Sequence, residues 1–131
     1  MDRPADARFA ESHEWVIIDG DTATLGVSDF AIEHLGDLVF VDLPEAGGEL
    51  EKGGTVCEIE SVKAVGEVYS PVSGTITEVN SGLADETAPL SSDPFGAGWL
   101  VKIKLNDASE AEALMDVTAY EAYLETADPG P

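Results

Sequence analysis

The chain has 131 residues, of which 44% are hydrophobic, so it has the size of one ordinary domain and enough apolar residues to form a core. Its formal charge of −21 at pH 7 argues against nucleic acid and anionic membranes as partners, because both attract lysine and arginine. We expect one monomeric domain over residues 1–131, with its core from about residue 9 to residue 125 and loose tails.

Two interpretations of the acidic composition stay open. The carboxylates can form a solubilising surface suited to a salt-adapted host, or they can steer the protein toward the basic faces of partner proteins. In both cases, association and stability should depend on salt, because the Debye length is roughly 8 Å at physiological ionic strength.

The single cysteine, Cys57, rules out an intrachain disulfide, and we interpret it as a small buried hydrophobe rather than a reactive thiol. No apolar stretch approaches the roughly 20 residues of a membrane-spanning helix. Residues 1–6 lack the charged and apolar regions of a signal peptide. We therefore expect a cytoplasmic bacterial protein, or a protein of the mitochondrial matrix if a leader has been removed.

The N-terminal half predicts a leader, a hairpin and a short helix. Residues 1–10 have the composition of a loose leader, and two strands over 14–18 and 22–27 flank a glycine-containing turn. Ser28 is suited to cap a helix over residues 29–35, which Gly36 ends in the left-handed conformation.

The rest of the chain predicts more strands, one long loop over residues 80–97 and two C-terminal helices. The first helix starts at Ser109, and the second opens on a capping box at Thr118 with Tyr120 and Leu124 facing inward. Residues 128–131 should be frayed. Further strands are expected over 38–43, 55–60, 65–69, 75–79 and 98–105. This pattern predicts a mainly β protein, a small sandwich or barrel with helical additions.

One lysine stands out in the predicted hairpin between the strands at 55–60 and 65–69. Lys63 lies at the tip, where an enzyme could reach its amine while the backbone holds its position, which makes it a candidate for covalent modification. The alternative is an exposed ion pair with Glu60 or Glu67 that contributes about 0 to 1 kcal/mol. A catalytic role is not indicated, since the chain has no nucleophile elbow, phosphate loop or spaced metal ligands.

The tip itself, Glu60-Ser61-Val62-Lys63-Ala64 followed by Ser70-Pro71-Val72-Ser73-Gly74, resembles the lipoyl attachment site of the glycine cleavage H-protein family. Further groups of residues extend the resemblance, in the same order and spacing, over roughly residues 9–125. These groups are Ser12-His13-Glu14-Trp15-Val16, Leu35-Gly36-Asp37, Val41-Asp42-Leu43-Pro44, Asp93-Pro94-Phe95, Gly98-Trp99-Leu100 and Lys102-Ile103.

The resemblance implies a lipoyl-domain-like fold, a barrel-sandwich hybrid that carries lipoate in amide linkage on Lys63 and has no catalytic turnover of its own. It implies that enzymes recognise the tip through Glu60, Ser61, Val62, Ala64 and Glu67. Such a carrier takes the aminomethyl group from a pyridoxal-phosphate glycine decarboxylase to a tetrahydrofolate-dependent aminomethyltransferase, and dihydrolipoamide dehydrogenase then reoxidises it. A lipoate ligase or lipoyl transferase would attach the cofactor.

The family also shelters the loaded arm in a cleft on the carrier, and the matching residues here are Ser12, Glu14, Val27, His34 and Glu67. Our hypothesis is that Glu14 and His34 hold the aminomethyl end by charge and hydrogen bonding. For His34 the alternative is a solvent-facing residue near a helix C-terminus, where the helix dipole favours its cation.

Two other functions stay open at this point. One is a lipoyl or biotinyl domain of another system, such as a 2-oxoacid dehydrogenase, although such domains typically have an aspartate or methionine beside the lysine. The other is a relay or scaffold that donates lipoate to other enzymes, which a reconstituted glycine decarboxylation assay would distinguish.

Overall fold

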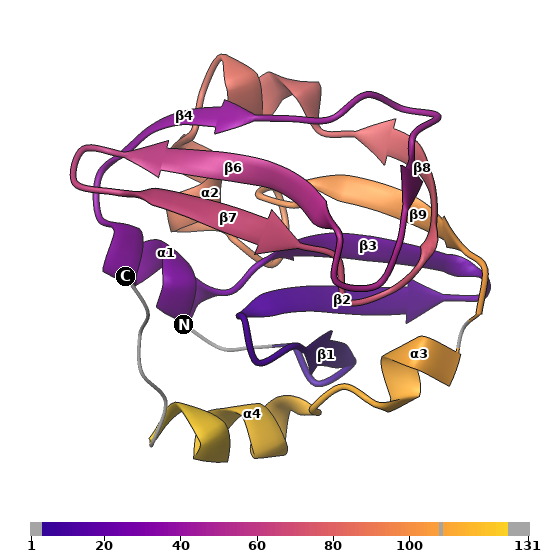
Figure 1. Ribbon diagram of the computed structural model, residues 1–131. Coiled ribbons are helices and arrows are strands. Elements are labelled where there is room, and N and C mark those ends of the chain that lie inside the picture. Colours follow the sequence, from indigo (N-terminus) through magenta and orange to yellow (C-terminus); the bar gives the residue numbers. More distant parts are fainter. Residues whose placement is uncertain (1–3, 108, 126–131) are drawn as a thin grey trace.

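Two antiparallel sheets stacked on each other form most of the computed structural model (Figure 1). The structure describes residues 4–107 and 109–125. The larger sheet has six strands, in the order β1 (Ala7–Phe9), β2 (Glu14–Asp19), β3 (Thr22–Val27), β9 (Val101–Leu105), β8 (Gly74–Val79) and β5 (Glu49–Leu50). The smaller has three, in the order β4 (Leu38–Asp42), β6 (Thr55–Ser61) and β7 (Val65–Tyr69).

Short helices close the edges of the two sheets. The helix α1 (Asp29–Leu35) is capped by Ser28, whose Oγ accepts from the Ala31 amide, and it ends at Gly36 with φ +80°. It lies below the tip of the β6–β7 hairpin in Figure 1. The remaining helical elements are η1 (Ser81–Ala84), α2 (Ala88–Ser92), α3 (Ser109–Glu112) and α4 (Val117–Leu124).

Alternating apolar residues of both sheets form the main core. On β6 the buried residues Val56, Cys57 and Ile59 face inward, while Glu58 and Glu60 are exposed. Cys57 is 5% exposed, and burial raises the pKa of its thiol to about 12, which suits the predicted core role. A second cluster, which we call the aromatic cluster, joins Ala7 and Phe9 of β1 and Trp15 of β2 with Tyr120 of α4.

The predicted fold class, mainly β with a short helix in the N-terminal half and helices at the C-terminus, is confirmed. The strand predictions over 22–27 and 65–69 and the helix over 29–35 match the structure residue for residue. None of the helices in the described part of the chain is long and apolar enough to cross a membrane.

Several local predictions were wrong. The last strand, expected over 98–105, begins only at Val101, because residues 98–100 are not part of a strand. Residues 7–9 form β1 instead of part of a loose leader, because Ala7 and Phe9 are buried in the aromatic cluster. The expected loop over residues 80–97 contains η1 and α2, each anchored by one buried leucine. The last helix starts at Val117, with the Asp116 carboxylate as its cap in place of Thr118. The expected fraying of 128–131 lies outside the described residues.

Candidate functional site

Lys63 lies in the exposed turn between β6 and β7, as the sequence predicts. Its neighbour Val62 is 76% exposed, the largest value among the exposed large hydrophobic residues. The stem of Lys63 passes near the end of α1, since a Cβ built on Gly36 would lie 3.8 Å from Lys63 Cε. Within residues 4–107 and 109–125, no carboxylate forms an ion pair with Lys63, so the alternative pairing with Glu60 or Glu67 is not formed.

Local hydrogen bonds fix the backbone of this turn. The buried Ser61 side chain both donates to the Ala64 carbonyl, at 2.9 Å, and accepts from the Ala64 amide, at 3.0 Å. The Ser61 amide donates to the same carbonyl at 2.8 Å, and the Val62 amide donates to the Asp37 carbonyl at 2.9 Å. The turn therefore presents Lys63 on a defined backbone, with its amine in solvent.

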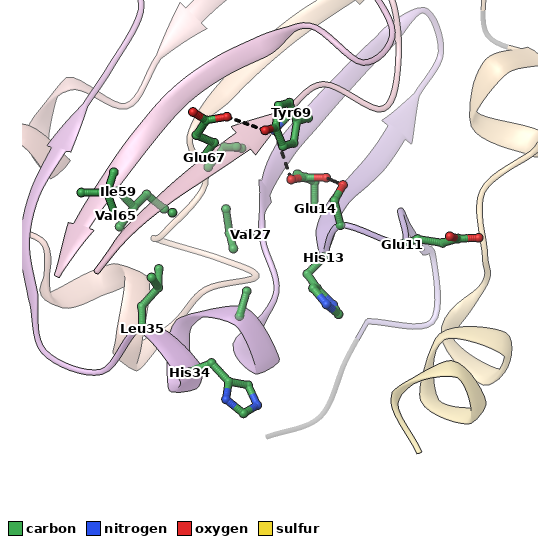
Figure 2. Close-up of a pocket in the computed structure, with 14 residues that line it drawn as sticks. Glu11, His13, Glu14, Val27, His34, Leu35, Ile59, Val65, Glu67 and Tyr69 are labelled. Carbon is green, nitrogen blue, oxygen red and sulfur yellow. Dashed lines mark hydrogen bonds between the residues drawn. The ribbon is translucent and has the colours of Figure 1, made fainter. Parts of the chain in front are cut away.

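A cleft of about 540 Å³ begins beside this tip and follows β7 between the two sheets and α1 (Figure 2). Its apolar walls come from Val27, Leu35, Ile59 and Val68. Gly66 makes the close approach of α1 possible, because a Cβ at this position would lie only 3.2 Å from Leu35 Cδ2. The first lining residue of β7 is Val65, two residues after Lys63.

The far end of the cleft holds a buried carboxylate. Glu14, the first residue of β2, is 2% exposed, and its Oε2 accepts from the Tyr69 amide at 3.1 Å. Its Oε1 accepts from the Ser12 hydroxyl. Burial raises the pKa of Glu14 from 4.5 to about 7, although both hydrogen bonds lower it. A carboxyl with this pKa can change its charge near neutral pH when a cation approaches.

Other polar groups also line the cleft. On β7 the Tyr69 hydroxyl donates to Glu67, and this hydrogen bond raises the pKa of Tyr69. His34 is exposed on the last turn of α1 with its ring against Phe30, at a centroid separation of 4.5 Å. His13 is 8% exposed and lies beside Glu14, and its pKa is lowered, first by burial and then by His34.

The structure places all five predicted cleft residues along this one cavity: Ser12, Glu14, Val27, His34 and Glu67. The predicted tip residues differ in exposure. Glu60, Val62 and Glu67 are exposed, Ala64 is half-buried, and Ser61 is buried, so Ser61 can act on an enzyme only through the shape of the turn.

Nine of the fourteen lining residues were not predicted to line the cleft, among them Tyr69 and His13. Tyr69 contributes its backbone amide, which no side-chain pattern reveals, and His13 contributes a ring placed by an unusual backbone angle, φ +78°. The one signal in the sequence for His13 was its position directly before Glu14, a predicted site residue.

The cleft suits a flexible aliphatic chain that ends in a polar or cationic group. Apolar walls favour the hydrocarbon part, and the carboxyl at the far end offers an ion pair to an amine. No group of three or more histidines, cysteines and acids within the described residues could hold a metal ion. Such a guest can be attached to Lys63, because the lysine precedes Val65, a lining residue of the cleft, by two positions.

Comparison with known proteins gives a consistent result. The family model described as "Glycine cleavage H-protein" matches residues 7–127. A glycine cleavage system H protein of Acidobacterium capsulatum is 49% identical over 95% of this chain and 95% of the relative. A mitochondrial glycine cleavage system H protein of Arabidopsis thaliana is 46% identical over 94% of this chain and 79% of the relative.

A solved structure agrees with the sequence relatives. The crystal structure of a glycine cleavage system H protein from Mycobacterium marinum superposes with a TM-score of 0.86 at 36% identity. The match covers 94% of this chain and 99% of that one.

Proposed function

This chain belongs to the glycine cleavage H-protein family, and on that premise we propose that Lys63 is the residue that carries its lipoyl group. The protein is a lipoyl-bearing shuttle of the glycine cleavage system, a carrier component without catalytic turnover. The proposal assigns the cofactor to one atom, Lys63 Nζ, in amide linkage.

The observation that carries this proposal is the junction of tip and cleft. Lys63 is exposed on a hydrogen-bonded turn, and the residues that follow it on β7 line the cavity. When attached, the lipoyl group supplies the disulfide that accepts the aminomethyl group left by glycine decarboxylation. The apolar walls would hold the hydrocarbon part of the arm, and Glu14 would face its amine-bearing end.

The direct test is the intact mass of the protein after incubation with lipoate, ATP and a lipoate ligase. We expect a gain of one lipoyl group in the wild type and no gain in Lys63→Arg, which keeps the charge. The remaining lysines, Lys52, Lys102 and Lys104, are the internal control, because a gain in Lys63→Arg would move the attachment site to one of them. No gain in the wild type, under conditions that modify a known carrier, would refute the proposal.

Glu14 is proposed to retain the loaded arm. Its carboxylate would bind the protonated amine inside the cleft, and the Ser12 and Tyr69 hydrogen bonds would fix its orientation. Loss of a hydrogen bond to a charged group corresponds to roughly 10- to 100-fold in a rate of release. We therefore expect Glu14→Ala to release ammonia from the loaded protein at least about 10-fold faster.

A matched control is Glu11→Ala, which removes an exposed carboxylate from the same turn and the same cavity wall. It should leave the release rate close to that of the wild type. Equal rates for Glu14→Ala and the wild type would contradict the assigned role of Glu14.

The partners we propose are the glycine decarboxylase, the aminomethyltransferase, dihydrolipoamide dehydrogenase and a lipoate-attaching enzyme. One carrier must serve each of them in turn, so docking has to be weak and short-lived. With a formal charge of −21, the protein would find basic partner surfaces rapidly at low salt, and rates of association should fall as salt is raised.

A further inference from the structure

The turn between β1 and β2 has the geometry of a β-turn followed by a bulge. The His13 amide donates to the Ala10 carbonyl at 2.9 Å, and the Ala10 amide donates to the Glu14 carbonyl at 2.9 Å. His13 takes the left-handed backbone conformation, with φ +78°. In such bulges this position is usually glycine, because only glycine adopts a positive φ without a steric penalty.

A histidine here must therefore contribute something through its side chain. A left-handed non-glycine residue costs roughly 1–2 kcal/mol, and glycine would avoid that penalty. The ring is nevertheless well packed, since His13 is only 8% exposed and lies 4.8 Å, centroid to centroid, from the Phe30 ring of α1. The strained backbone at His13 thus places a buried ring in the lining of the cleft.

The ring is held by the C-terminal helix. His13 Nδ1 lies 2.9 Å from the Tyr120 hydroxyl, a buried hydrogen bond between residues 107 positions apart. The same hydroxyl lies 2.7 Å from Ser28 Oγ, and Ser28 Oγ caps α1. One hydroxyl of α4 thus connects the turn before Glu14 with the helix that forms the opposite side of the cleft.

Tyr120 is itself placed with little freedom. It is fully buried, and its ring stacks on Phe9 of β1 with centroids 4.2 Å apart and planes 4° from parallel. Phe9 lies on β1, before the turn. Tyr120 of α4 therefore contacts both the strand before the turn and the ring of His13. The position of the turn relative to α1 consequently depends on α4.

We propose that His13 is a positioning residue of the arm cleft, through which Tyr120 of α4 holds the turn that sets Glu14 and Ser12 against each other. The left-handed bulge at His13 places these two side chains, two residues apart, on one side of the backbone, where they form a hydrogen bond. His13 also lines the cavity directly. This inference rests on the proposed function of the cleft, and it adds α4 to the machinery that retains the arm.

The first experiment uses the full-length protein without lipoate and measures the pKa of the Glu14 carboxyl by ¹³C NMR. His13→Gly keeps the backbone conformation and removes the ring, and Tyr120→Phe removes only the hydroxyl. In both variants we expect water to reach Glu14, so its pKa should fall from about 7 toward 4.5. His13→Asn tolerates the left-handed backbone and offers an amide to Tyr120, so it should restore part of the shift.

The matched control is Tyr123→Phe. Tyr123 stands on the same helix, and its hydroxyl donates to the Glu11 carbonyl of the same turn at 3.2 Å, but that bond does not involve the His13 ring. We expect the pKa of Glu14 to stay near its wild-type value in this variant. A fall as large as in Tyr120→Phe would overturn the specific role of His13.

The second experiment measures ammonia release from the lipoylated, loaded protein. Loss of one neutral hydrogen bond corresponds to roughly 2- to 10-fold, so His13→Gly and Tyr120→Phe should release ammonia faster by that factor. An unchanged Glu14 pKa together with an unchanged release rate in His13→Gly would overturn the inference. If even the wild type accepted no lipoyl group, the proposed function would fail, and the NMR titration would still decide whether His13 positions Glu14.

Discussion

The two ends of the cleft are built in opposite ways. At the tip, Ser61 and Ala64 are tied by hydrogen bonds that span three residues of sequence, the Val62 amide donates to Asp37, and the side chains of Val62 and Lys63 are exposed. At the far end, Glu14 is tied to Tyr69 across 55 residues and His13 to Tyr120 across 107, and His13, Glu14 and Tyr120 are all buried. The tip is a local structure, whereas the far end depends on the whole fold.

This difference corresponds to two requirements on a carrier. The tip must be recognised by separate enzymes, so it combines a rigid backbone with exposed side chains. The far end must keep water from the cargo, so it places one carboxyl in an environment of low polarity and accepts the desolvation penalty. Substitutions at the far end should therefore change stability and its pH dependence, and substitutions at the tip should change modification.

The largest effect is expected from the protonation of Glu14. Because its pKa is about 7 in the folded protein and 4.5 when solvated, the folded state binds the proton more tightly. The contribution of Glu14 to the free energy of unfolding should consequently be greatest below pH 4.5 and be lost, by about 3 kcal/mol, as the pH rises from 4.5 through 7. Glu14→Gln should lack this decline, which denaturant titrations of both proteins between pH 4 and 8 at constant salt would show. Parallel pH profiles would refute the comparison.

The next effect concerns the packing beside Glu14. Gly26 of β3 pairs with Trp15 of β2, and a Cβ at Gly26 would lie 2.6 Å from Trp15 Cε2. Gly26→Ala should force the indole to move and lower the free energy of unfolding by about 1–3 kcal/mol, with a change in tryptophan fluorescence. Gly20→Ala is a control with open space around its Cβ, although its positive φ adds a smaller strain. Similar losses in both would mean that backbone strain, and not the Trp15 contact, dominates.

At the tip we expect a smaller loss of stability and a clear loss of modification. Ser61→Ala removes the hydroxyl that bridges the amide and carbonyl of Ala64, worth about 1 kcal/mol. The rate of lipoate attachment should fall, because Lys63 would no longer sit on a fixed turn, whereas the pH profile assigned to Glu14 should be unchanged. Ser91→Ala, at an exposed position on α2, should alter neither quantity. A normal attachment rate in Ser61→Ala would show that the enzyme does not need the ordered turn.

The smallest effect on stability is expected at Val62. With 76% of its surface exposed, Val62→Ser should change the free energy of unfolding by less than about 0.5 kcal/mol. Attachment of lipoate should nevertheless slow down, since an apolar side chain beside Lys63 is available to an enzyme pocket. Val39→Ser, at another exposed valine, is the matched control. Equal attachment rates in the wild type and both variants would remove Val62 from the recognition set.

The same contrast explains what the sequence could predict. The helix over 29–35 and the strand over 65–69 follow from capping residues and alternation within a few positions, and their bounds were predicted correctly. Lys63 could be assigned to a hairpin tip for the same reason. The wrong predictions at residues 7–9, 80–97 and Thr118 concern segments whose structure depends on distant apolar partners or on a competing cap.

The candidate site shows the same difference between local patterns and contacts of distant residues. Ser12, Glu14, Val27, His34 and Glu67 could be named only because family resemblance carries information about distant positions; no local pattern brings them together. The contacts of the Tyr69 amide and the Tyr120 hydroxyl could not be predicted from the sequence, since they follow from strand register and from the placement of α4. The raised pKa of Glu14 depends on burial, which a single sequence does not encode locally.

The long span between His13 and Tyr120 also fixes an order of assembly during translation. Residues 61–64 are synthesised well before residue 120, so the bonds between Ser61 and Ala64 do not depend on α4. Until α4 emerges, the His13 ring has no Tyr120 to hold it, so the shelter for the cargo is the last part of the molecule to be finished. A chain that stops short of α4 would therefore keep the modifiable lysine and lose the protected end of the cleft.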